Sequence, residues 1–341
     1  MVTPKKIIRS ICLFTSSPAG SSFDDLQSFR KHLISRSFEV QTLRLCSPAL
    51  IKIMEMDKSY SGKGYIFGVG SLTTETINKY LSRLLAGSET HWNLDLTVKE
   101  IENEDIQILF KIIKNNPQKT FNFAYVFNNR SSSPFFPSAN YLDEGFSIGL
   151  QSTDLSLGCN SLHEWLENQK SAWQEINDLF TSDSRFLGID SSVAPLVTDS
   201  GSFIGFIKRL GLNFSQTVTT DFYLTITDFI KKNNPKPIGL CGLMFPCLED
   251  AELANEYENG NFAIERNIYL SLHSGLGIDT YPIGIDENPQ RVLEILKLLQ
   301  KLSNKYTKPL SCRFVSDGKT RIGGKSDFQN QYLKDVVIRK L

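Results

Sequence analysis

Short apolar runs alternate with amphipathic segments along most of the 341-residue chain. Runs of strand length with alternating or continuous apolar residues predict strands at 7–15, 38–45, 65–70, 121–127, 146–150, 186–190, 238–243, 280–283, 310–315 and 336–339. Apolar residues at helical spacing predict helices at 23–35, 74–85, 101–115, 161–180, 202–210, 221–232, 248–258, 264–272 and 291–306. Strands interleaved with helices in this way predict an α/β protein with one large, mainly buried sheet or barrel. Because no linker-like stretch divides the chain, we expect a single domain over residues 1–341.

The stretch 131–140 is the longest segment without a repeating pattern. It contains two prolines, which exclude a helix interior, and two adjacent aromatic residues, Phe135 and Phe136. Polar residues beside aromatic ones are typical of a lid or pocket wall rather than of a flexible linker. The alternative is that this loop docks a partner protein.

Three apolar runs end in acidic residues, at Asp190, at Glu249 with Asp250, and at Asp279. An apolar strand that stops at a carboxylate marks the carboxyl edge of a buried sheet, where α/β proteins place their ligands. We therefore expect these four carboxylates to gather over one pocket.

Carboxylates at such an edge can act as general acid and base, and we assign all four as candidate catalytic residues. Asp190, Glu249 and Asp279 are also candidate ligands for Mg²⁺ or Mn²⁺, because these cations prefer hard oxygen donors. The alternative is that each carboxylate caps a helix, since acidic residues at helix starts commonly bind free backbone N–H groups.

Several polar residues near the same strand ends are candidates for binding a ligand. Arg130 and Arg321 could clamp an anion, because guanidinium groups bind carboxylates and phosphates in a fixed geometry. The other candidate ligand-binding residues are Asn128, Ser191 and His273.

Composition limits the partners. Lys and Arg together equal Asp and Glu, so the net charge is zero and the chain lacks the basic excess of nucleic-acid-binding proteins. The six cysteines are scattered without a CxxC pair, which indicates a reducing compartment, and no apolar stretch approaches the roughly 20 residues of a membrane span. We expect a cytoplasmic protein that binds a small molecule, with a homo-oligomer left open.

The segments that carry the carboxylates resemble a known family. RFLGIDSSVAP at 185–195, GLCGLMFPCLEDA at 239–251 and SGLGIDTYPI at 274–283 are similar to segments of domain-of-unknown-function family 711, often labelled "PFL family" after pyruvate formate-lyase. Further similar segments are IRSI at 8–11, SPFFP at 133–137 and KPLSCR at 308–313. The resemblance implies a fold akin to the glycyl-radical enzymes, a ten-stranded α/β barrel of two antiparallel-related halves. The family has no settled activity, so the resemblance implies no catalytic roles.

The sequence argues against radical chemistry. RIGGK at 321–325 is only loosely similar to the loop that carries the glycyl radical, since Lys325 stands where an aromatic residue is expected. We therefore expect a barrel without a functional radical loop. The leading hypothesis is a small-molecule enzyme that acts on an anionic or carboxylate-bearing metabolite, and the alternative is a non-catalytic binding or regulatory protein on an enzyme-derived barrel.

Overall fold

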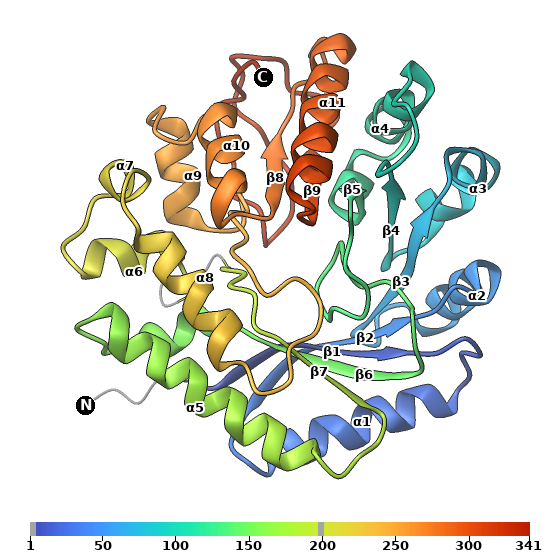
Figure 1. Ribbon diagram of the computed structural model, residues 1–341. Coiled ribbons are helices and arrows are strands. Elements are labelled where there is room, and N and C mark those ends of the chain that lie inside the picture. The colour runs from blue at the N-terminus through green and yellow to red at the C-terminus, as the bar shows by residue number, and fades with distance from the viewer. Residues whose placement is uncertain (1–4, 197–200) are drawn as a thin grey trace.

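The computed structural model describes residues 5–196 and 201–341, and its core is one mixed β-sheet with helices around it (Figure 1). The strands are β1 (Ile7–Phe14), β2 (Glu39–Cys46), β3 (Tyr65–Leu72), β4 (Thr90–Asp95), β5 (Phe123–Phe127), β6 (Gly145–Leu150), β7 (Phe186–Asp190), β8 (Gly277–Pro282) and β9 (Leu310–Val315). The α-helices are α1 (Ser21–Ile34), α2 (Leu50–Tyr60), α3 (Thr74–Ala86), α4 (Asn103–Asn115), α5 (Leu162–Phe180), α6 (Phe203–Arg209), α7 (Phe214–Thr217), α8 (Phe222–Asn233), α9 (Ala251–Glu258), α10 (Ile264–His273) and α11 (Pro289–Tyr306). Two 3₁₀ helices are η1 (Pro117–Asn122) and η2 (Ser152–Ser156). The predicted α/β fold is confirmed.

The strand order is β7-β6-β1-β2-β3-β4-β5-β9-β8, and the sheet changes direction twice. Strands β1 to β5 are parallel to one another, whereas β6 is antiparallel to β1 and β9 is antiparallel to β5. Strands β7 and β8 are parallel to β6 and β9, respectively. One edge of the sheet therefore holds the amino ends of β1 to β5 together with the carboxyl ends of β6 to β9.

The nine strands do not form the closed ten-stranded barrel that the resemblance implied. The predicted strand at 238–243 is absent, and the segment 237–246 makes only isolated bridges to the ends of β7 and β8. Its backbone is not regular, because Gly239 (φ 71°) and Cys241 (φ 47°) adopt positive φ values. The amides of Leu240 and Cys241 donate to the Asp190 carboxylate and not to a neighbouring strand.

Two further differences have local causes. β4 was missed because its inward residues His91 and Asn93 are polar, which conceals the alternation of apolar residues. The predicted strand at 336–339 contributes only an isolated bridge, between Val337 and Lys325.

The helices cover the outer face of the curved sheet, and loop segments occupy the middle of the view in Figure 1. One of these, coloured green, is the connection from β5 to β6 that contains the stretch 131–140. The inward face of β1, β2 and β4 carries polar residues, including Ser10, Arg44 and His91, although all three are buried. Polar side chains inside a sheet surrounded by helices indicate a binding site.

Candidate functional site

A cavity of about 120 Å³ lies at the edge where β1 to β5 begin and β6 to β9 end. Arg9 lies near the amino end of β1, whereas Arg44 of β2, Asp279 of β8 and Arg313 of β9 lie at inner positions of their strands. We call this cavity the arginine chamber, and its ionisable side chains are Arg9, Arg44, His91, Glu249, Asp279, Arg313 and, at the rim, Tyr332.

Arg313 is the central group of the chamber. Its Nε donates to Asp279 Oδ1 at 2.6 Å, and its Nη2 donates to Glu249 Oε1 at 2.5 Å. Nη1 donates to the Phe121 carbonyl oxygen at 3.2 Å, and the rings of Phe121 and Phe136 lie 4.8 and 5.5 Å from the guanidinium carbon. Charge-assisted hydrogen bonds of this kind hold a guanidinium in one orientation.

Glu249 has one carboxylate oxygen that Arg313 does not occupy. Glu249 Oε2 lies 3.6 Å from Arg9 Nη2, beyond the range of a hydrogen bond. The pKa of Glu249 is raised above its ordinary value, chiefly by burial. The positive charges of Arg313 and Arg9 favour the charged form and oppose this rise without cancelling it. A carboxyl group with a raised pKa, and with one oxygen that is ion-paired to Arg9 but accepts no hydrogen bond from the described residues, is equipped to carry a proton.

Arg44 is only partly paired. Its Nη1 lies 3.3 Å from His91 Nδ1, and its Nε has no hydrogen-bond partner among the described residues. Burial, and secondly the positive charge of Arg44, holds the pKa of His91 well below its usual range. The imidazole is therefore neutral, so that Nδ1 can accept from Arg44.

The chamber carries an excess of positive charge. Three arginines face two carboxylates on its wall, which leaves one positive charge uncompensated. Burial lowers the pKa values of Arg9 and Arg44, and such desolvation is offset only by a counter-charge nearby. The chamber is thus suited to an anion.

The loop predicted as a pocket wall lines the chamber. Pro134, Phe135 and Phe136 form part of the lining, and the Phe136 ring packs edge-on against His91 at 4.9 Å. Ser133 Oγ donates to Asp190 Oδ2 at 2.6 Å, which fastens the loop to the end of β7. Phe135 is buried, so this aromatic residue contacts the interior and not the surface.

A second cavity of about 810 Å³ adjoins the chamber. We call it the outer cavity; its walls include the 3₁₀ helix η1 and the carboxyl-terminal segment 327–333. The two cavities share the wall residues Thr42, Ile66, His91, Phe121 and Tyr332. A ligand held in the chamber can therefore extend into the outer cavity.

Asp190 does not line the chamber. It is fully buried and accepts hydrogen bonds from Ser133 Oγ, from the Ser192 amide (2.9 Å) and hydroxyl (2.6 Å), and from the amides of Leu240 (3.0 Å) and Cys241 (3.1 Å). All of these bonds tie loops to the end of β7. The structure thus gives Asp190 an anchoring position behind the chamber wall.

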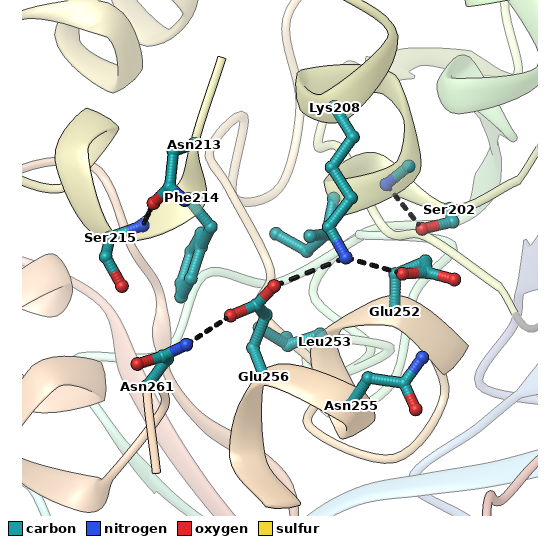
Figure 2. Close-up of polar contacts among 12 residues, drawn as sticks. Ser202, Lys208, Asn213, Phe214, Ser215, Glu252, Leu253, Asn255, Glu256 and Asn261 are labelled. Atoms are coloured by element: carbon teal, nitrogen blue, oxygen red, sulfur yellow. Dashed lines mark hydrogen bonds and ion pairs between the residues drawn. The ribbon is translucent and has the colours of Figure 1, made fainter. Parts of the chain in front are cut away.

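Asp250 is enclosed by two helix amino termini. It accepts from the amides of Glu252 and Leu253 at the start of α9, and from Ser202 Oγ and the amides of Phe203 and Ile204 at the start of α6. Figure 2 shows the neighbouring contacts between these helices, in which Lys208 Nζ lies 2.6 Å from Glu252 and 3.3 Å from Glu256. We call Asp250, Ser202, Lys208, Glu252 and Glu256 the capping cluster. The expectation that four carboxylates share one pocket is therefore wrong, because only Glu249 and Asp279 line it.

The other predicted ligand-binding residues also lie away from the chamber. Asn128 follows β5 at the opposite edge of the sheet and donates to Ser303 and Asn304 of α11. His273 ends α10, where its Nδ1 lies 3.0 Å from Ser274 Oγ, and Ser191 Oγ accepts from Asn234. Arg130 and Arg321 are exposed. The sequence does not show that β6 to β9 run opposite to β1 to β5. Residues that follow strands were therefore predicted to share one edge of the sheet, although they lie at two.

A divalent cation does not fit the donors present. No group of three or more His, Cys, Asp or Glu side chains that could hold a metal ion occurs within residues 5–196 and 201–341. Asp190 is bound to Ser133 and Ser192, and the Arg313 guanidinium already lies between Glu249 and Asp279. The predicted set of Asp190, Glu249 and Asp279 therefore does not form a metal site.

The site residues predicted from the sequence did not include Arg9, Arg44, His91 or Arg313. Each arginine interrupts a strand of apolar residues, as in IIRSIC, TLRLC and SCRFV. A charged residue between buried neighbours is a usable signal, because an unpaired charge is rarely buried without a function. That signal would have found all three arginines.

The fold and site define an α/β protein with a mixed sheet and a buried, arginine-rich cavity at one edge. The model of the family described as "Uncharacterised ACR (DUF711)" matches residues 89–329, and the chain belongs to this family. The resemblance stated from the sequence is thereby confirmed. No curated protein matches the chain. None of the helices in the described parts of the chain has the length and apolar character needed to cross a membrane.

Proposed function

We propose that the chain is an enzyme that acts on a small anionic metabolite bound in the arginine chamber. The observation that carries this proposal is the excess of positive charge in the chamber wall, three arginines against two carboxylates, with Arg44 and Arg313 buried and Arg9 partly buried. An anionic group of the ligand would compensate that charge, and the low dielectric of the buried site would strengthen the interaction.

Glu249 is the proposed proton-transferring group. Its pKa is raised by burial, and its Oε2 is free of Arg313, so this oxygen can take or give a proton at the ligand. Arg313 and Asp279 are positioning residues in this proposal, because their mutual hydrogen bond holds the guanidinium that orients Glu249.

A second candidate function is a binding or regulatory protein without turnover. The observation in its favour is that Arg313 already pairs with both chamber carboxylates, which limits their freedom to act as base. In that case the same anion would bind without being converted.

The relation to the glycyl-radical barrel is part of the proposal. It is supported by the family match and by the opposite directions of β1 to β5 and β6 to β9. It is also supported by the parallel bridges that the segment 237–246 makes beside both outermost strands of the sheet, β7 and β8. A glycyl radical is not proposed, because the RIGGK segment lacks the expected aromatic residue. The protein is proposed to work in the cytoplasm as a small-molecule enzyme with no nucleic-acid or membrane partner.

The test is a thermal-shift screen of carboxylate and phosphate metabolites, followed by a turnover assay on each compound that raises the melting temperature. Wild-type protein is expected to convert at least one such compound, and Glu249→Gln is expected to bind it with a turnover rate lower by about 10²-fold or more. Glu258→Gln is the matched control, because Glu258 lies at the end of α9 outside both cavities. Stabilisation without turnover would favour the binding protein, and a screen without a single anionic hit would contradict both functions.

A further inference from the structure

We propose that the ligand is a monocarboxylate whose carboxylate binds at Arg44 Nε and Ser10 Oγ, with its uncharged remainder extending past Tyr332 into the outer cavity. This inference rests on the proposed function, because it assumes an anion in the arginine chamber.

Two buried donors in the chamber wall have no hydrogen-bond partner among the described residues. Arg44 is 6% exposed and Ser10 is 2% exposed, both line the chamber, and neither Arg44 Nε nor Ser10 Oγ has a partner among the described residues. The two residues lie on the neighbouring strands β1 and β2, where Ser10 pairs with Thr42 and Cys12 pairs with Arg44. A buried donor without a partner costs about 1–3 kcal/mol, so two of them on one cavity wall are suited to an acceptor on a ligand.

All three nitrogens of the Arg313 guanidinium are already engaged in hydrogen bonds. Its Nε, Nη1 and Nη2 donate to Asp279, Phe121 and Glu249, respectively. Arg44 differs, because His91 engages its Nη1 while its Nε stays unbound. The chamber thus contains one arginine that positions other side chains and one arginine that is ready for a ligand.

The charge balance of the chamber limits the charge of the ligand. One uncompensated positive charge in the chamber matches one carboxylate and not a dianion. The cations of the outer cavity are already engaged: Lys119 Nζ donates to the Ser88 carbonyl oxygen at 2.5 Å, and Lys319 Nζ pairs with Asp327 at 2.7 Å. The part of the ligand in the outer cavity therefore needs no second anionic group.

The volumes of the two cavities limit how the ligand can be placed. A cavity of about 120 Å³ is well below the roughly 300–1,000 Å³ of ligand pockets, so the chamber holds an end group and not a whole metabolite. The outer cavity of about 810 Å³ falls in that range and presents Tyr65, Phe121 and Tyr332 as apolar surface. Tyr332 belongs to both walls, so the ligand must pass beside it.

The experiment measures binding of four probes by saturation-transfer NMR: butyrate, its neutral analogue butyramide, succinate and inorganic phosphate. Wild-type protein is expected to bind butyrate more tightly than succinate or phosphate and not to bind butyramide. Arg44→Gln is expected to weaken butyrate binding about tenfold or more, and Ser10→Ala several-fold. Arg130→Gln, which removes an exposed arginine, is expected to bind as wild type does.

A second readout separates a ligand-binding role from a structural one. Because Ser10 Oγ has no partner among the described residues, Ser10→Ala is expected to leave the melting temperature of the ligand-free protein unchanged or raised. Arg44→Gln removes a buried, uncompensated cation together with its contact to His91 Nδ1, two effects of opposite sign, so the melting temperature is expected to change little. A melting temperature several degrees lower, with butyrate binding intact, would mean that these residues serve the fold and would overturn the proposal. If Arg44→Gln fails to fold, Ser10→Ala supplies the binding result.

The outcomes also distinguish this inference from the proposed function. Butyrate binding that survives Arg44→Gln but is lost in Arg9→Gln would overturn the Arg44 anchor and leave an anion-binding chamber in place. Tighter binding of phosphate or succinate would overturn the monocarboxylate class alone. If the wild-type protein binds none of the three anions, the anchor and the proposed function both fail.

Discussion

Glu249 and Asp250 are neighbours in the chain, but they belong to two regions with opposite properties. Asp250, in the capping cluster, accepts five hydrogen bonds from donors that start α6 and α9, so its carboxylate is fully satisfied by the fold. Glu249, in the arginine chamber, has one bound oxygen and one oxygen that lies 3.6 Å from Arg9. A buried carboxylate bound by backbone amides stabilises the fold, whereas a buried carboxylate with an open oxygen remains available to a ligand. The two are distinguished by their partners and not by their burial.

The largest effect should come from removing the chamber's central cation. Arg313→Met leaves Glu249 and Asp279 as buried carboxylates without their shared guanidinium, and we expect a loss of about 3–5 kcal/mol in the free energy of unfolding at pH 7. Lowering the pH should recover part of this loss, because protonation removes the uncompensated charge. Urea unfolding at pH 7 and pH 5 measures both effects. A loss below about 1 kcal/mol would contradict the central role of Arg313.

Asp250→Ala should destabilise the capping cluster nearly as strongly. α9 loses its amino-terminal cap and the first amides of α6 lose their acceptor, and at about 0.5–2 kcal/mol for each helix terminus we expect a loss of about 1–4 kcal/mol. Asp250→Asn retains one acceptor oxygen and should lose about half as much. Ligand binding to whatever fraction stays folded should be unchanged. If Asp250→Ala instead abolished binding without loss of stability, the contrast with Glu249 would be wrong.

Glu249→Gln should change how the free energy of unfolding varies with pH more than it changes the free energy of unfolding at any one pH. The folded-state pKa of Glu249 is raised, chiefly by burial, so the folded protein holds this proton more tightly than the unfolded chain, whose value is about 4.3. The contribution of Glu249 to the free energy of unfolding is therefore greatest below the unfolded pKa and falls as the pH rises through the folded pKa. Glutamine does not titrate, so the stability of wild type relative to the variant should decline over that window. Urea unfolding in steps from pH 4 upward measures the slope, and a difference that does not vary with pH would count against the raised pKa.

Lys208→Met should have the smallest effect. Lys208 bridges Glu252 and Glu256 in the capping cluster, but its side chain is 44% exposed, and exposed ion pairs contribute about 0.2–1 kcal/mol (Figure 2). We expect a loss within that range, and an even smaller loss at high salt because of screening. A thermal melt at 0.05 M and 0.5 M salt measures both. A loss comparable to that of Asp250→Ala would mean that the ion pairs of the capping cluster stabilise the fold as much as its hydrogen bonds to helix termini do.

The sequence predicted the α/β fold and many of the elements because apolar periodicity is a local property. The strand at 7–15 and the helix at 74–85 were predicted within two residues, as β1 and α3, and Thr73 caps α3 as its sequence indicated. The irregular backbone at 237–246 could not be predicted, because it depends on hydrogen bonds to Asp190, more than forty residues earlier. Long-range partners of this kind override a local pattern.

The site was predicted in part. Asp279 does line the chamber, although it is the third residue of β8 and not its last, and the 131–140 loop does form a wall. Arg9 and Arg44 were missed because the rule that ligands bind at the carboxyl ends of strands holds here only for β6 to β9. Arg9 and Arg44 come from the other half of the sheet, where the same edge holds amino-terminal positions. Which strand ends share an edge is set by strand direction, and strand direction is a property of the assembled sheet.

The reversal of strand direction also determines which groups produce the electrostatic field in the chamber. Helices α2, α3 and α4 end beside the amino ends of β3, β4 and β5, so they present carbonyl groups to the chamber edge. Helices α9 and α11 begin at that edge and present amide groups to it. Because helix termini carry partial charges of opposite sign, the two sets oppose each other. The sign of the charge that the chamber favours is therefore set by a few side chains, and exchanging Arg44 for glutamate would change the balance on its wall from one excess positive charge to one excess negative charge.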